Sequence, residues 1–172
     1  MQNLDSSAPV VALRNALHDI TYNDPLAEHA DRIAALRQHM PHAIEVLPPW
    51  IDSIYNCVMH AFELTPADFP NPPFAAYYAK PALIRLLLEK GDLVERGEPA
   101  PGRLIVYFHE GAPKHIGRLA ENTRVRSQWG TGNLYQHVMA EVPIDYGSQV
   151  SFFEPPNRET LLTRVEEWTT SF

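Results

Sequence analysis

The fold is decided by residues 101–129, PGRLIVYFHEGAPKHIGRLAENTRVRSQW. Turn signals divide this stretch at 101–102 (Pro-Gly), at 110–113 (Glu-Gly-Ala-Pro) and at 121–123 (Glu-Asn-Thr). Between the turns lie runs rich in branched and aromatic side chains, which predict strands over 103–108, 114–119 and 124–129. Because the connections are only a few residues long, we expect the three strands to pair antiparallel, as a meander.

The segments downstream extend and cover this sheet. A fourth strand is expected over 148–153, and Asn157 is suited to cap a helix that runs to the C-terminus. Residues 130–133 break the third strand, and we expect a helix over 134–142.

Upstream of residue 101 the apolar spacing is helical. The pattern predicts helices over 10–20, 26–40, 57–64 and 82–90, the second of them capped by Asp24 and beginning at Pro25. Prolines make residues 41–56 an extended approach to the third helix. Helices followed by an antiparallel meander and a last helix indicate an α+β fold. We expect one domain over 1–172, with a helical N-terminal part (1–45), a core (50–153) and a C-terminal helix (157–172).

Composition limits the class of protein. Of the 172 residues, 45% are hydrophobic and 20% charged, as in an ordinary globular domain. The formal net charge of −7 argues against nucleic acid as the main partner, because phosphate contacts need a cationic face. No apolar stretch approaches the ~20 residues of a membrane span, and the N-terminus has no signal-peptide pattern. We expect a cytoplasmic protein with no membrane partner, and leave open its export without a cleaved leader.

The single cysteine, Cys57, can form neither an intrachain disulfide nor a cysteine-rich zinc site. It follows Asn56, a good capping residue, at the expected start of helix 57–64. Unpaired backbone amides and the helix dipole at such a position favour the thiolate, the form that a cysteine nucleophile needs. The alternative is a small buried core cysteine, which placement alone favours.

A base for this thiol has to come from another part of the chain. His115 opens the second strand of the meander, and Gly117 permits a close approach of neighbouring backbone. The alternative for His115 is a strand-edge histidine that faces solvent. His60, one helical turn after Cys57, could tune the thiol, although local packing is the favoured role.

Together these segments resemble the NlpC-type cysteine peptidases and amidases, which have a papain-like fold. The likeness rests on the Tyr-Asn-Cys of residues 55–57, the strand 103–108 and the His-Ile-Gly of residues 115–117, and it spans about residues 50–153. It implies a papain-like core in which the cysteine helix packs on an antiparallel sheet whose second strand supplies the histidine. It also implies a hydrolase of amide or peptide bonds: a peptidase, an amidase or a deamidase.

The sequence departs from that pattern in two places. Asn56 stands where the family commonly has Asp, and Gly-Arg-Leu at 102–104 opens the first strand where the family has Gly-Asp-Leu. In the family, a polar residue on the next strand orients the histidine. Here that region offers Ser127 and Gln128, of which Gln128 could bond to the imidazole, and His137 is the alternative if the helix expected over 134–142 folds back over the site.

The remaining candidates surround the cysteine. The backbone amide of Cys57, with Asn56 or Tyr55, would stabilise an oxyanion. Four aromatic residues are candidates to line a substrate groove, although they could equally plug the edge of the core: Trp50, Tyr77, Tyr78 and Trp129.

No spacing marks a metal site, and we expect no cofactor. The expected partner is a peptide or protein substrate. The alternative to an enzyme is a non-catalytic α+β interaction module of the immunity or adaptor type, whose acidic surface binds a protein.

Overall fold

The computed structural model describes residues 1–51, 55–70, 81–130 and 132–170. Within these ranges the centre of the molecule is an eight-stranded sheet in which every pairing is antiparallel. The strands are β1 (Gln2–Asn3), β2 (Glu45–Leu47), β3 (Val94–Arg96), β4 (Leu104–His109), β5 (Ala112–Leu119), β6 (Val125–Gln128), β7 (Leu134–His137) and β8 (Gln149–Glu154). Their order is β1-β8-β4-β5-β6-β7-β2, and β3 also pairs with β8.

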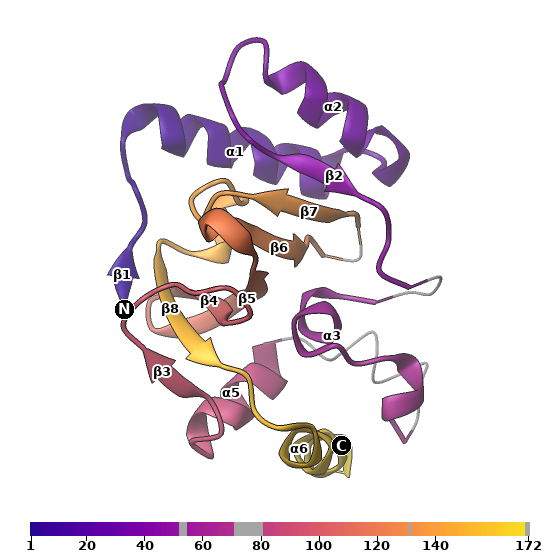
Figure 1. The fold of residues 1–172 in the computed structure, drawn as a ribbon. Helices are drawn as coiled ribbons and strands as arrows, with labels where there is room; N and C mark the ends of the chain where they lie inside the picture. The colour runs from indigo at the N-terminus through magenta and orange to yellow at the C-terminus, as the bar shows by residue number, and fades with distance from the viewer. Residues whose placement is uncertain (52–54, 71–80, 131, 171–172) are drawn as a thin grey trace.

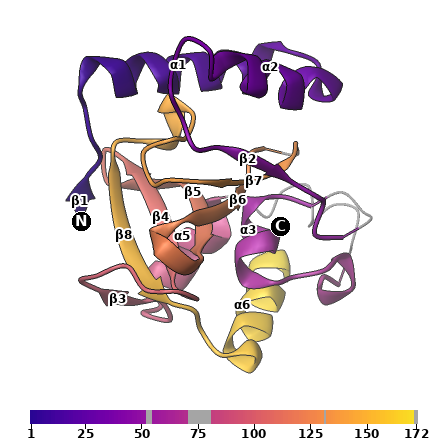
Figure 2. The same ribbon diagram turned by 45° about the horizontal axis from the view of Figure 1, so that its top comes forward.

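Helices cover both faces of this sheet (Figures 1 and 2). One face carries α1 (Ala8–Asn23) and α2 (His29–Leu36), and the other carries α3 (Cys57–Phe62), α5 (Pro81–Glu89) and α6 (Arg158–Thr170). Single 3-10 turns are η1 (Leu26–Glu28), η2 (Pro66–Asp68), η3 (Glu121–Thr123) and η4 (Ile144–Tyr146). In the part of the chain that the structure describes, none of the helices has the length and apolar character to cross a membrane.

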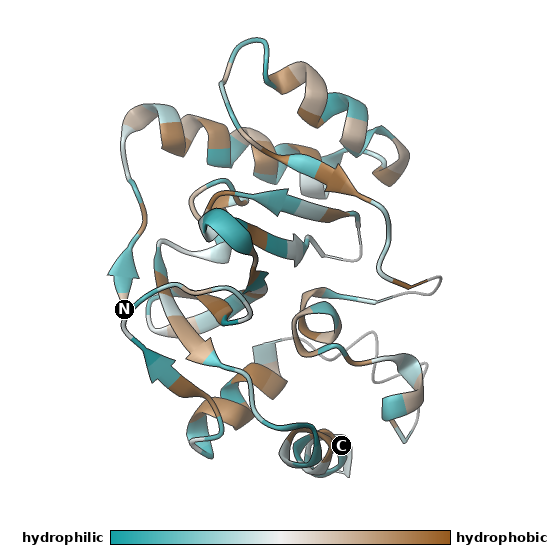
Figure 3. Ribbon diagram, in the orientation of Figure 1, coloured by the Kyte–Doolittle hydropathy of each residue, from teal (hydrophilic) through white to brown (hydrophobic). Residues whose placement is uncertain are grey.

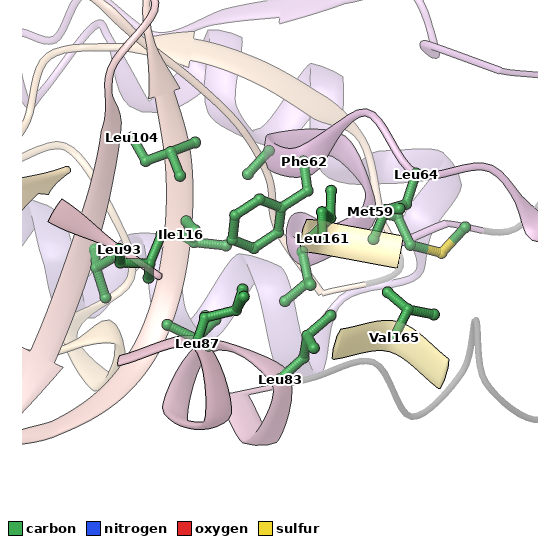
Figure 4. Packing of buried hydrophobic residues seen from close by; sticks show 14 of the residues in the cluster. Met59, Phe62, Leu64, Leu83, Leu87, Leu93, Leu104, Ile116, Leu161 and Val165 are labelled. Atoms are coloured by element: carbon green, nitrogen blue, oxygen red, sulfur yellow. The ribbon is translucent and has the colours of Figure 1, made fainter. Parts of the chain in front are cut away.

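The sheet separates two hydrophobic clusters, and the alternation along β4 shows why. Leu104 and Val106 pack toward α3, α5 and α6, whereas Ile105 and Tyr107 pack toward α1. A strand buried on both faces needs an unbroken apolar run, which is how residues 104–108 read. Figure 4 shows the first cluster, with Phe62 of α3 among side chains from the sheet and from α6. Figure 3 shows hydrophilic and hydrophobic residues interleaved along α1 and α2, as in helices that bury one side.

The predicted α+β class is confirmed, as is an antiparallel sheet followed by a C-terminal helix. Strands β4, β5, β6 and β8 lie within a few residues of their expected bounds, and α3, α5 and α6 form where helical spacing predicts them. The N-terminal segment is built into the same sheet, because β1 forms one edge and β2 the other.

The helix predicted over 134–142 is wrong. Residues 134–137 form strand β7, which pairs with β6 on one side and with β2 on the other. Four residues are too few for local periodicity to separate a strand from a helix. What decides the conformation is the backbone of β2, which comes from nearly ninety residues upstream in the chain.

The helix predicted over 26–40 is shorter than expected. Its first turn is the 3-10 helix η1, and the α-helix proper runs only from His29 to Leu36. Asp24 does not cap it: the carboxylate instead accepts from the Arg32 side chain, 3.0 Å from Nε. Because Pro25 is in an extended conformation, the chain enters the helical region after the proline.

Candidate functional site

Cys57 is the first residue of α3, and the Asn56 side chain holds the start of this helix. Asn56 has an extended backbone, and its Oδ1 accepts from the amides of Val58 at 3.0 Å and Met59 at 3.1 Å. The prediction that Asn56 caps the helix is therefore confirmed. Cys57 itself is half-buried, at the margin of the cluster beneath α3.

His115 lies on β5 and is 1% exposed. Its ring stacks on Tyr146, with centroids 3.9 Å apart and planes 13° from parallel, and it also contacts the ring of Tyr107 opposite it on β4. Burial lowers the pKa of His115 well below its usual value, and the nearby His137 and His60 lower it further. The imidazole is therefore neutral at neutral pH. Its Nε2 has no hydrogen-bond partner among the described residues.

The alternation along β5 decides which face of the sheet the imidazole occupies. Ile116 belongs to the cluster on the α3 side, whereas Leu119 and the ring partners of His115 belong to the cluster on the α1 side. The His115 ring therefore packs with the cluster on the α1 side, whereas Cys57, at the start of α3, packs at the margin of the other cluster. In the described chain β6 pairs with β5 only at residues 118–119, so the first part of β5, including His115, is not paired on that side.

Tyr146 is the titratable residue that stacks on His115. Burial raises the pKa of the Tyr146 phenol well above its usual value, and the charges of Tyr22 and Cys57 raise it further. Sequence reasoning gave Tyr146 no role, because the 3-10 turn that carries it lies some thirty residues from His115 and ninety from Cys57.

Gly147 sets the position of this tyrosine. Its backbone is in the left-handed region, with φ of 103°, and a Cβ added there would lie 2.0 Å from the carbonyl oxygen of Phe108. Only glycine therefore allows the turn that carries Tyr146 to lie directly on the end of β4.

Arg14 holds the same loop from the other side. The side chain is buried, and burial is the largest effect on its pKa, which is lowered. Its guanidinium group donates to four backbone carbonyls of one loop: those of Val142, Pro143, Ile144 and Gly147. Because these bonds satisfy a buried cation with backbone alone, Arg14 organises the segment that carries Tyr146. The amphipathic spacing of α1 marks neighbouring apolar positions but gives no signal for this role.

The two residues expected to orient His115 have other partners. Gln128 Nε2 donates to the carbonyls of Tyr55 at 3.0 Å and Gly132 at 2.9 Å. His137 comes from strand β7 rather than from a helix folded over the site. Its Nε2 lies 2.9 Å from the Ser127 hydroxyl and its Nδ1 2.8 Å from the carbonyl of Val138. These bonds tie strands and loops together, and neither side chain reaches the His115 ring through them.

Tyr55 supports the loop that precedes α3. Its hydroxyl accepts from the backbone amide of Trp50 at 2.8 Å, and the Trp50 ring meets the Tyr55 ring edge to face. The hydroxyl therefore has a structural partner in this conformation. Trp50 itself is half-buried and lines a pocket beside α3.

Of the other three aromatic candidates for a substrate groove, only Trp129 lies among the described residues. Trp129 is 2% exposed, stacks on Tyr135 and donates from Nε1 to Ser127 at 3.2 Å, so its indole lies in the core under α1. Tyr77 and Tyr78 lie outside the described residues. Within the described ranges, no group of three or more His, Cys, Asp or Glu side chains is placed to hold a metal ion.

We compared the chain with protein-family models, with curated proteins and with solved structures, and none of the three comparisons gave a match.

Proposed function

We propose that this protein is a cysteine hydrolase of amide or peptide bonds with a papain-like core, in which Cys57 is the nucleophile and His115 its base. One observation carries the proposal. The buried imidazole of His115 has no hydrogen-bond partner at Nε2 among the described residues, and it lies on β5, the strand against which the Cys57 helix α3 packs. A buried polar atom left without a partner is rare in proteins and is often associated with function.

The chemistry follows from a neutral imidazole. Because the His115 imidazole is neutral, it can take the proton of the Cys57 thiol, and sulfur bonds to the carbonyl carbon. The C–N bond then breaks, and the proton passes from His115 to the leaving amine. Water adds to the resulting thioester and returns the thiol. The backbone amide of Cys57 and the amide side chain of Asn56 are the candidate donors to the oxyanion.

Acylation by p-nitrophenyl acetate tests this proposal. We expect a burst of nitrophenol and an acetyl thioester on Cys57, detected by intact-mass spectrometry and absent from Cys57→Ser. His115→Gln should slow the burst by about 100-fold, the lower end of what a general base contributes. The matched control is His109→Gln, an exposed histidine at the end of β4, which should acylate like the wild type.

Two outcomes would count against the enzyme. One is the absence of any thioester on a folded protein, and the other is an unchanged burst in folded His115→Gln. Either would favour the second candidate function, a non-catalytic interaction module. The 1% exposure of His115 speaks for that candidate, because such burial suits a core residue. The module predicts that Cys57→Ala leaves partner binding intact.

A further inference from the structure

A pocket of about 260 Å³ lies between α3 and the paired ends of β5 and β6. His60, which lines it, is one helical turn after Cys57 on the same side of α3. The pocket therefore lies on the side of α3 that carries Cys57, although Cys57 itself does not line it. Its lining residues are Trp50, His60, Glu63, Arg118, Leu119, Ala120 and Arg126.

The first sign of a ligand is the His60 ring. His60 is 9% exposed, and neither of its ring nitrogens has a hydrogen-bond partner among the described residues. Among the described residues, the aromatic ring nearest to it is that of Trp50, which meets it edge to face at a centroid distance of 5.8 Å. Burial of two unsatisfied polar atoms opposes folding, so a group that bonds to them would be bound favourably.

The second sign is a pair of like charges. Arg118 and Arg126 face each other directly in the β5–β6 register, an arrangement that destabilises a sheet unless an anion compensates it. Glu63 pairs with Arg118. Arg126 donates to the neutral amide of Gln136 at 3.0 Å and has no carboxylate partner among the described residues.

The charged side chains of the pocket indicate the charge of the ligand that it suits. Two guanidinium groups and one carboxylate leave the pocket with one positive charge, on a chain whose formal net charge is −7. A single positive charge matches a monoanionic carboxylate better than a dianionic phosphate. The planar guanidinium group of arginine also matches the geometry of a carboxylate.

We propose that this pocket binds a carboxylate of the peptide substrate, close to the bond that Cys57 attacks. The Arg126 guanidinium group and a His60 N–H donate to the carboxylate oxygens, and the Trp50 ring covers the aliphatic part of the same residue. The assignment of this carboxylate to a substrate rests on the proposed function, whereas the binding does not. Two sources have this chemistry: an Asp or Glu side chain, and the C-terminus of a peptide.

Titration with small probes tests the pocket and separates these sources. The probes are N-acetylglutamic acid α-amide (side-chain carboxylate), N-acetylalanine (terminal carboxylate) and N-acetylalanine amide (no carboxylate), followed by the NMR signals of the His60 ring. We expect saturable binding of one carboxylate probe, at least about tenfold tighter than binding of the neutral amide. Equal binding of all three probes would overturn the proposal, as would tighter binding of inorganic phosphate.

Substitutions then locate the contact. Arg126→Gln should weaken binding of the preferred probe about tenfold, and the exposed position of Arg126 makes a folding defect unexpected. Arg96→Gln is the matched control, since Arg96 is an exposed strand arginine on β3 that lies near Glu154. Glu63→Gln should tighten binding, because it leaves Arg118 uncompensated. Unchanged affinity in Arg126→Gln would refute the site.

The two proposals can fail separately. Carboxylate binding should persist in Cys57→Ala, and the acetyl thioester should form without any pocket ligand. Binding without acylation would therefore refute only the proposed enzymatic activity, and acylation without selective binding would refute only the proposed carboxylate pocket.

Discussion

At the scale of single residues, the most constrained position beside the site is Gly147. Its positive φ and its contact with the Phe108 carbonyl act together, because the first disfavours any side chain and the second leaves no room for one. Tyr146 precedes it, so the placement of the ring on His115 depends on a residue that has no side chain.

Gly147→Ala should lower the free energy of unfolding by about 2–4 kcal/mol, measured by urea denaturation, because strain and overlap add. Gly111→Ala is the matched control. Its φ is 77°, yet a Cβ there meets nothing within 4 Å, so it should cost only the conformational term of about 1–2 kcal/mol. Equal losses of unfolding free energy in the two variants would show that the overlap with Phe108 does not destabilise the protein.

At the scale of elements, α3 is the helix most dependent on its cap. It spans only six residues, and Glu63 ends it in the left-handed conformation with φ of 56°. A helix this short has little stability of its own, so the Asn56 cap and packing against β5 hold it in place.

Asn56→Ala should lower the free energy of unfolding by about 1–2 kcal/mol, because two backbone amides lose their acceptor. Asn56→Asp should restore most of this loss, since a carboxylate caps equally well and also favours the helix dipole. Thermal unfolding of both variants measures the effect. An Ala variant as stable as the wild type would mean that packing alone holds α3.

At the scale of the whole molecule, three buried histidines make stability depend on pH. Burial lowers the pKa of His60 and of His137 to about 4 and that of His115 well below 6.5. Between about pH 4 and 6.5 the unfolded chain therefore binds more protons than the folded one. Stability rises with pH in this window and is lost on acidification.

The free energy of unfolding should fall as the pH drops from 7 to 4, with about 3 kcal/mol lost at pH 4 for each histidine whose pKa is about 4. Urea denaturation at several pH values measures this slope. His60→Phe should reduce the slope and be the more stable variant at pH 5, because its ring does not need to lose a proton on folding. A stability that is constant from pH 7 to 5 would contradict the burial of these rings.

Much of the fold follows from local pattern. The strands β4, β5, β6 and β8 were predicted because turn residues separate short apolar runs, and α3 because Asn56 precedes a segment without helix breakers. Strand β7 was mistaken for a helix, because four residues carry too little periodicity and their partner β2 is distant in the chain. Of the candidate site, Cys57 and His115 were proposed from sequence, whereas no role was predicted for Tyr146 or Arg14.

The amino-acid sequence by itself determined the α+β class, the antiparallel meander and the place of Cys57 at the start of a capped helix. Hydrophobic periodicity, turn residues and capping residues are local properties of the sequence. Only the tertiary structure decided that the His115 ring packs with the cluster on the α1 side, stacked on Tyr146. It also decided that Arg118 and Arg126 lie opposite each other beside His60. The face that a side chain occupies depends on strand register and on which distant segments pack there, and no local pattern carries that information.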